Sequence, residues 1–267
     1  MAVRVGAVSY LNARPLVRGL DRWPERFCVR FDVPSRCAEL LHAGEIDLGL
    51  IPAVEYLGGD YRVVPDVAVA SDGAVASVAL FTRVPVERIR SVALDTSSRT
   101  STMLIRVLCA HHFRIAPAFV HEEPDLRAML ARHDAALLIG ERALFGDAAA
   151  AQARKIDLGS EWRELTGLPF VYAFWAGMSG TLAPDDVARL QEARNTGERQ
   201  AAEVAAEFFP ADPTRRREGE RYLRENIRYR LGARELAGFE RFLRLAHDTG
   251  VAGPPRRVRF YAAATGD

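Results

Sequence analysis

The strongest constraint on the fold is an alternation of short apolar strands with helical segments, which occurs twice along the chain. The first series comprises predicted strands at 3–8, 27–33 and 46–51, with helices over 34–41 and 54–57. The second comprises predicted strands at 92–94, 118–121 and 135–139, with helices over 102–112 and 124–133 and another that begins at Gly140. Strands joined through helices form a parallel sheet that helices cover. The pattern therefore predicts an α/β protein with two such units.

The segments around the second series predict how the two units are connected. Further strands are expected at 63–70, 75–82 and 155–158, and Arg83-Val-Pro-Val-Glu87 is typical of a boundary. The aromatic run at 168–175 is expected to return to the first unit as a strand. We therefore expect a first lobe made of 1–83 and 172–267, a second lobe made of 84–171, and a central cleft that closes about extended crossings.

After residue 184 the apolar residues recur at the spacing of amphipathic helices. Breaks are expected at 210–213, Gly232 and Gly250, where proline or glycine interrupts the pattern. We expect these C-terminal helices to pack on the first lobe.

Composition excludes several classes of partner. The chain has 267 residues, 49% of them hydrophobic, with 36 Lys and Arg against 35 Asp and Glu, a formal net charge of +1. No overall field would attract nucleic acid or an anionic membrane, so neither is expected as a partner. The N-terminal sequence runs directly into a strand pattern without the features of a signal peptide, which predicts a cytoplasmic protein. The sequence makes no prediction of the oligomeric state.

The cysteines and histidines give no sign of metal chemistry. Cys28, Cys37 and Cys109 form no CxxC pair and are expected to be reduced thiols that pack as small apolar residues. The six histidines are scattered, and His111 and His112 are adjacent rather than spaced to share a helix face. We therefore expect no metal site.

Polar residues follow several predicted strands at the point where each strand ends. Ser9 and Asn12 follow the first strand, Ser98, Thr100 and Ser101 follow the strand at 92–94, and Gly140 follows the strand at 135–139; Ser77 lies within a strand. Ligands of open α/β sheets bind beyond the carboxyl ends of the strands, and the first N–H groups of a helix attract anions. Taken singly, each residue is more often structural, with Asn12 as an N-cap, Ser77 as a locally bonded hydroxyl and Gly140 as a helix cap. Together they predict a cleft for a small anionic molecule.

Six motifs carry a resemblance to a known family. They are Ser9-Tyr-Leu-Asn-Ala-Arg-Pro15, Gly44-Glu-Ile-Asp-Leu-Gly-Leu-Ile-Pro52, Ser77-Val-Ala-Leu-Phe81, Leu94-Asp-Thr-Ser-Ser-Arg-Thr-Ser101, Ile139-Gly140 and Gly167-Leu-Pro-Phe-Val-Tyr-Ala-Phe-Trp175. Over nearly the whole chain, this combination resembles the chorismate dehydratases of the futalosine route to menaquinone. These are cytoplasmic enzymes whose fold resembles that of type 2 periplasmic solute-binding proteins.

The resemblance implies that chorismate loses water to give 3-[(1-carboxyvinyl)oxy]benzoate, without a cofactor. It also implies that Asn12 is the catalytic asparagine and that Ser77, Thr100 and Ser101 hold the carboxylates of the substrate. We add Ser9, Ser98 and Gly140 as binding residues from their positions. An amide is too weakly basic to hold a proton, so we expect Asn12 to orient the reacting groups while a substrate carboxylate accepts the proton from C3. The motifs assign no role to Arg14, Arg99 or Glu141.

Two alternatives remain open on the sequence. A solute-binding or sensor protein of the same fold would need only the cleft. The sister enzyme that makes 1,4-dihydroxy-6-naphthoate shares the fold but is expected to carry a different N-terminal motif and a catalytic histidine. The Ser9-Tyr-Leu-Asn12 run, and cleft motifs without histidine, favour the dehydratase.

Overall fold

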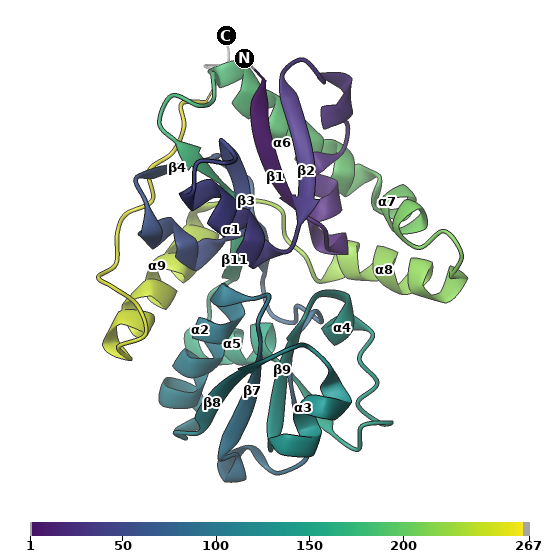
Figure 1. Cartoon of the computed structure of the whole chain (residues 1–267), viewed down its shortest axis with the longest axis vertical. Helices are drawn as coiled ribbons and strands as arrows, with labels where there is room; N and C mark the ends of the chain where they lie inside the picture. The colour runs from purple at the N-terminus through teal and green to yellow at the C-terminus, as the bar shows by residue number, and fades with distance from the viewer. Residues whose placement is uncertain (1, 264–267) are drawn as a thin grey trace.

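The computed structural model describes residues 2–263 and shows two α/β lobes, one above the other in Figure 1. Lobe 1 is built on the sheet of β1 (Val3–Val8), β2 (Phe27–Asp32), β3 (Leu48–Pro52), β4 (Tyr61–Val63), β5 (Val69–Ser71) and β11 (Phe170–Met178). Its strand order is β2-β1-β3-β11-β4, and β5 also pairs with β11. Lobe 2 is built on β6 (Val78–Thr82), β7 (Ser91–Asp95), β8 (Ala118–Glu122), β9 (Ala135–Ile139) and β10 (Arg154–Asp157), in the order β10-β6-β9-β7-β8.

Helices cover both sheets. The α-helices are α1 (Pro34–His42), α2 (Arg99–Leu108), α3 (Leu126–Arg132), α4 (Gly140–Leu144), α5 (Leu158–Thr166), α6 (Pro184–Arg199), α7 (Ala201–Phe208), α8 (Pro213–Glu225) and α9 (Ala233–Asp248). Short 3-10 helices occupy η1 (Leu11–Val17), η2 (Leu20–Arg22), η3 (Ala53–Gly58) and η4 (Val86–Arg88), and η5 (Cys109–Phe113) is a π-helical turn that continues α2. Within residues 2–263, no helix is long and apolar enough to span a membrane.

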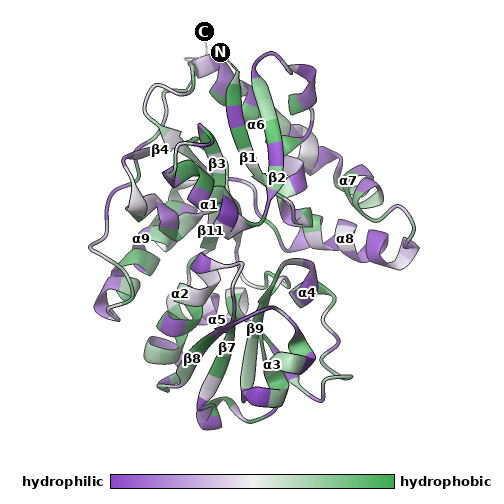
Figure 2. Cartoon of the chain, viewed as in Figure 1, coloured by the Kyte–Doolittle hydropathy of each residue, from purple (hydrophilic) through white to green (hydrophobic). Residues whose placement is uncertain are grey.

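Both sheets are mixed rather than purely parallel. In lobe 1, β1 pairs in parallel with β2 and β3, whereas β11 runs antiparallel to its neighbours. In lobe 2, β7 pairs in parallel with β8 and β9, whereas β6 and β10 are antiparallel additions. The predicted α/β alternation is confirmed for the parallel strands, and Figure 2 shows that the strands of both lobes are predominantly hydrophobic.

The pairing of β6 places the boundary between the lobes before residue 78, whereas the sequence predicted it near residue 83. β6 pairs with β9 and β10, so 78–82 belongs to lobe 2 and the chain leaves lobe 1 between Ser71 and Val78. All five residues of β6 are buried, so the strand has no alternation of polar and apolar residues. A strand buried on both faces fits either sheet equally well, and the sequence could not assign it.

Other element boundaries also differ from expectation. The strand expected at 63–70 is two short strands, because the chain turns at Pro65 and at Asp66, whose φ is 60°. Helix α2 begins at Arg99 rather than at Thr102, because Ser98 is its N-cap and accepts a hydrogen bond from the Ser101 amide. The strand expected at 155–158 is present as β10.

The C-terminal helices pack on lobe 1 and also reach lobe 2. α6 and α7 contact η1, and α9 packs on β11 and lies against α2. Phe242 of α9 is buried between Phe170 of β11 and Trp162 of α5, with ring centroids 4.8 and 5.8 Å apart. The lobes are therefore joined by packing as well as by the two crossings.

Gly238 marks a close contact between α9 and the return crossing. A Cβ at this position would collide with the carbonyl oxygen of Pro169, just before β11. We expect Gly238→Ala to lower the free energy of unfolding by about 1–3 kcal/mol, because α9 must shift to admit the methyl group. The control is Gly253→Ala, whose Cβ would have no atom within 4 Å. Denaturant titrations of both variants measure the difference, and equal stability would show that α9 is not seated as described.

Candidate functional site

A cavity of about 60 Å³ lies between the lobes, at the carboxyl ends of β1, β3 and β9. Residues from both lobes form its wall: Val8, Tyr10, Asn12, Ala13, Pro34, Leu50, Pro52, Val69, Val75, Ser77, Val78, Ser98, Thr100, Ser101, Ile139, Gly140, Tyr172 and Ala173. Ligand pockets usually measure about 300–1,000 Å³. The cavity is smaller than this range, so a ligand of ordinary size would fit only if the lobes moved apart.

The structure brings most of the predicted site residues to this wall. Asn12, Ser77, Ser98, Thr100, Ser101 and Gly140 all line the cavity. Ser9 is not among the lining residues. Its amide donates to Asp32 and its carbonyl oxygen accepts from Arg14, so its backbone joins β1 to neighbouring segments. A binding role for each residue stays a prediction.

Three hydroxyl groups of the wall already accept a hydrogen bond from the protein. Ser77 Oγ accepts one from the Tyr222 hydroxyl at 2.7 Å, and Ser98 Oγ accepts one from the Ser101 amide at 3.2 Å. Thr100 Oγ1 receives a longer contact of 3.5 Å from an amide of η3. Each hydroxyl keeps its own proton to donate. The wall therefore presents hydrogen-bond donors, which suit an anionic ligand.

Asn12 occupies the second position of η1 rather than its N-cap. Tyr10 is the N-cap residue and makes no side-chain cap bond, so the reading of Asn12 as an N-cap is wrong. The hydroxyl of Tyr222, from α8, interacts with the Asn12 side chain as well as with Ser77. Burial raises the pKa of Tyr222, which keeps its hydroxyl protonated at neutral pH. Tyr222 thus joins the predicted catalytic residue to a predicted binding residue.

The loop that carries Ser77 is held by a carboxylate of lobe 2. Asp157 accepts hydrogen bonds from the amides of Val75 and Ala76, at 3.0 and 2.6 Å, and it also caps α5. Ala76 has a φ of 62°, in the left-handed region that non-glycine residues rarely adopt. Asp157 stabilises this turn, which directs buried Ser77 to the cavity.

Two contacts cross between the lobes immediately before Asn12. The Tyr10 hydroxyl donates to Ser97 Oγ at 3.0 Å, and the Leu11 amide donates to Glu141 Oε1 at 2.7 Å. Burial raises the pKa of Tyr10 to about 12, so this phenol remains a donor. Burial also raises the pKa of Glu141, and the hydrogen bonds from the amides of Leu11 and Glu141 itself oppose that shift.

Arg14 and Arg99 lie away from the cavity wall. The Arg14 guanidinium packs over the Phe31 ring at 4.0 Å, in an open groove of about 810 Å³. Arg99 is half-exposed and forms ion pairs of 3.1 Å with Glu39 and Glu55 of lobe 1. The pair with Glu39 is exposed, and pairs of this kind contribute about 0–1 kcal/mol, so it adds little to the contact between the lobes.

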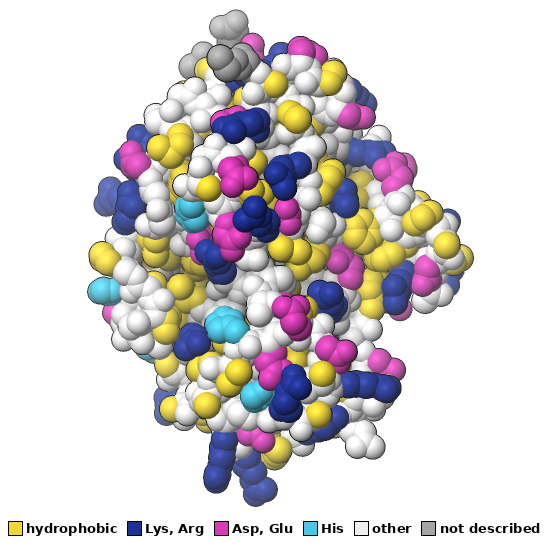
Figure 3. Space-filling model, viewed as in Figure 1, with side chains coloured by type: hydrophobic (Ala, Val, Ile, Leu, Met, Phe, Trp, Pro, Cys, Tyr) yellow, Lys and Arg dark blue, Asp and Glu magenta, His cyan; other side chains and the backbone are white. Residues whose placement is uncertain are grey.

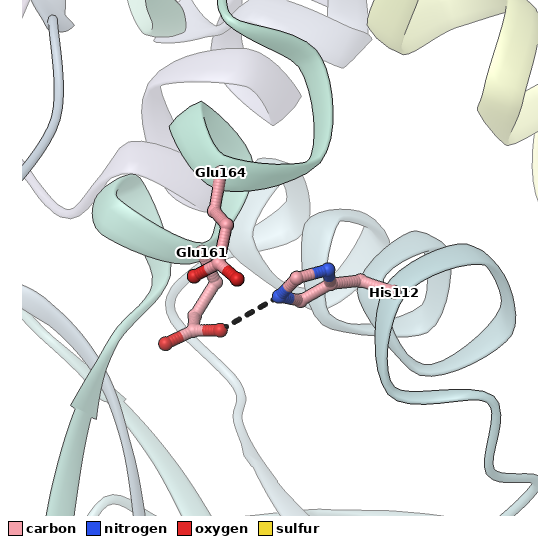
Figure 4. Close-up of side chains that lie close together, drawn as sticks. All are labelled: His112, Glu161 and Glu164. Atoms are coloured by element: carbon pink, nitrogen blue, oxygen red, sulfur yellow. Dashed lines mark hydrogen bonds and ion pairs between the residues drawn. The ribbon is translucent and has the colours of Figure 1, made fainter.

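The one His and carboxylate group with ligand-like spacing in residues 2–263 lies outside the cavity wall. It consists of His112 on η5 with Glu161 and Glu164 on α5, which point toward one another in Figure 4. His112 Nε2 lies 2.9 Å from Glu161 Oε2, so this hydrogen bond accounts for the pair. The expectation of no metal site stays a prediction.

Neither the buried thiols nor the surface charge suggests another site. Burial raises the pKa of Cys37 and of Cys109 to about 12, which keeps both as unreactive thiols. On the face shown in Figure 3, basic and acidic side chains are interspersed, as the near-neutral composition predicts.

Comparison with known proteins identifies related sequences. The family model described as menaquinone biosynthesis matches residues 3–248. Chorismate dehydratase from Thermus thermophilus is 32% identical over 219 residues, 75% of this chain and 79% of that protein. Chorismate dehydratase from Campylobacter jejuni is 28% identical over 177 residues, 63% of this chain and 64% of that protein.

Solved structures with the same fold include a protein from Archaeoglobus fulgidus, with a TM-score of 0.74 and 16% identity over 94% of this chain and 98% of that one. The alkanesulfonate-binding protein SsuA from Xanthomonas axonopodis pv. citri aligns with a TM-score of 0.69 and 17% identity, over 96% of this chain and 95% of that one. The likeness confirms the predicted two-lobed fold of the periplasmic binding proteins.

Gly140 offers a test of the contact between the lobes. Its φ is 61°, and a Cβ would lie 3.3 Å from the Tyr10 ring. We expect Gly140→Ala to destabilise the protein more than Gly44→Ala, which has a similar φ of 69° but no atom within 4 Å of its Cβ. The control should cost about 1–2 kcal/mol for its backbone conformation alone. Unfolding titrations measure both losses, and equal losses would show that Tyr10 does not rest on Gly140.

Proposed function

The chain belongs to the menaquinone biosynthesis family, and we propose that it is a chorismate dehydratase that converts chorismate to 3-[(1-carboxyvinyl)oxy]benzoate and water. Two relatives of that name, from Thermus thermophilus and Campylobacter jejuni, support the proposal.

The donor character of the cavity wall is the observation that carries the proposal. Chorismate has two carboxylates, and Ser77, Ser98 and Thr100 each keep a proton to donate to an anion. Ser101 lies in the first turn of α2, where the helix dipole also favours negative charge. These donors suit a dicarboxylate although no Lys, Arg or His lines the wall within the described chain.

The chemistry requires little acid or base from the protein. Loss of the proton at C3 and of the hydroxyl at C4 makes the ring aromatic, which favours the product strongly. The described wall contains no Asp, Glu or His side chain that could act as a base. A carboxylate of the substrate, held by the hydroxyl donors, therefore accepts the C3 proton in this proposal. The proton then leaves with the C4 hydroxyl as water, and Asn12 orients the reacting groups.

Two alternatives have specific support. The likeness to SsuA is consistent with a protein that only binds a small anion. The family also includes other enzymes of the futalosine pathway, such as the sister enzyme that makes 1,4-dihydroxy-6-naphthoate. Incubation with chorismate separates the dehydratase from both alternatives, because neither of them converts chorismate to the substituted benzoate. Loss of the diene absorbance with formation of the substituted benzoate supports the dehydratase, whereas binding without turnover supports a binding protein.

Asn12→Ala tests the catalytic assignment. An amide that orients groups in the transition state should be needed more for turnover than for binding, so we expect kcat to fall about 100-fold or more while chorismate still binds. Asn195→Ala, on α6 and outside the cavity wall, is the matched control. Turnover assays, chorismate titrations and thermal melts are compared. A folded Asn12→Ala protein with full activity would remove the assignment.

Ser101→Ala tests the binding assignment. Loss of one hydrogen bond to a charged group costs about 1.5–3 kcal/mol, so chorismate should bind roughly 10-fold to 100-fold more weakly. Ser160→Ala is a close control, because both serines are the third residue of a helix and both amides bond to the N-cap side chain. Calorimetric titration measures the affinities. Equal affinity in the two variants would argue against a carboxylate at Ser101.

A further inference from the structure

We infer that Glu141 is a positioning residue, which holds the segment carrying Asn12 in its working place when the lobes close. The inference rests on the proposed function in so far as Asn12 acts on chorismate. The contact itself belongs to the closed structure and can be measured without a substrate.

The contact joins the start of one helix in each lobe. Glu141 is the second residue of α4, and its Oε1 accepts a hydrogen bond of 2.7 Å from the amide of Leu11, the first residue of η1. Leu11 is fully buried and directly precedes Asn12. The carboxylate of lobe 2 therefore fixes the backbone next to the predicted catalytic amide of lobe 1.

A second contact holds the residue before Leu11. The Tyr10 hydroxyl donates to Ser97, whose own hydroxyl donates to buried Asp95 at 2.5 Å. The Tyr10 ring rests on Gly140, the neighbour of Glu141 in sequence, where the absence of a Cβ permits the approach. Two consecutive residues before Asn12 are thus held by lobe 2, and separation of the lobes would release both.

The geometry favours positioning over direct catalysis. Glu141 is not among the residues that line the cavity, and its carboxylate accepts hydrogen bonds from the amides of Leu11 and of Glu141 itself. A carboxylate occupied in this way is poorly placed to take a proton from a substrate. Closure instead completes the site by fixing Asn12, as lobe closure does in other enzymes.

The kinetic test compares Glu141→Ala with Glu141→Gln. We expect kcat to fall about 10-fold to 100-fold in Glu141→Ala, with KM changed less than about threefold, because the Asn12 segment loses its partner. The glutamine oxygen can still accept from Leu11, so Glu141→Gln should recover most of kcat. Glu87→Ala, an exposed residue of η4, is the control. A glutamine variant as inactive as the alanine variant would overturn positioning in favour of a base, and a normal kcat in Glu141→Ala would overturn any role in the reaction.

Hydrogen exchange at the Leu11 amide tests the contact without substrate. This amide should exchange at least about 10-fold faster in Glu141→Ala than in the wild type, and Glu141→Gln should restore protection, while the amides of β1 are unchanged. Unchanged exchange at Leu11 would overturn the inference. If the wild type does not dehydrate chorismate, the proposed function fails, and the exchange result still decides whether Glu141 holds this segment.

Discussion

The segment that carries Asn12 is held against lobe 2 by hydrogen bonds that Tyr10 and Leu11 make with Ser97 and Glu141. Leu11 and Ser97 are buried where the lobes meet, and a hydrogen bond there is electrostatically stronger than in solvent. Donors and acceptors that are buried in this way must also be paired, since a buried polar group without a partner costs about 1–3 kcal/mol of stability. The hydrogen bonds that hold the Asn12 segment in place therefore also pair the buried polar groups beside it.

The site offers hydrogen-bond donors to an anion, but no Lys, Arg or His side chain lines its described wall. Arg14 and Arg99 are engaged elsewhere, with Phe31 and with carboxylates of lobe 1. A hydroxyl that already accepts one hydrogen bond, such as that of Ser77, has fewer directions in which it can donate its own proton. Neutral donors of this kind discriminate by geometry more than by charge, which suits a ligand whose carboxylates must be aligned with the reacting carbon atoms.

Local sequence patterns predicted the parallel strands and the residues at their ends, because both depend on neighbours along the chain. They could not assign β6, since a fully buried strand has no polar face to orient it. They also missed Tyr222, which lies 145 residues from Ser77 in the sequence. Tyr222 belongs to the apolar face of a predicted helix, and such a face indicates packing rather than a binding site. Glu141 directly follows a predicted site residue, but its partner, 130 residues away, is a backbone amide, which leaves no mark in the sequence.

The packing of α9 against elements of both lobes has a consequence for the entropy of ligand binding. Phe242 packs against Phe170 and Trp162, so the two lobes share an aromatic contact besides their two covalent crossings. An open form that keeps this contact samples a narrower range of lobe orientations than one joined by flexible segments alone. Less conformational entropy is then lost when a ligand closes the lobes, and more of the interaction energy appears as affinity.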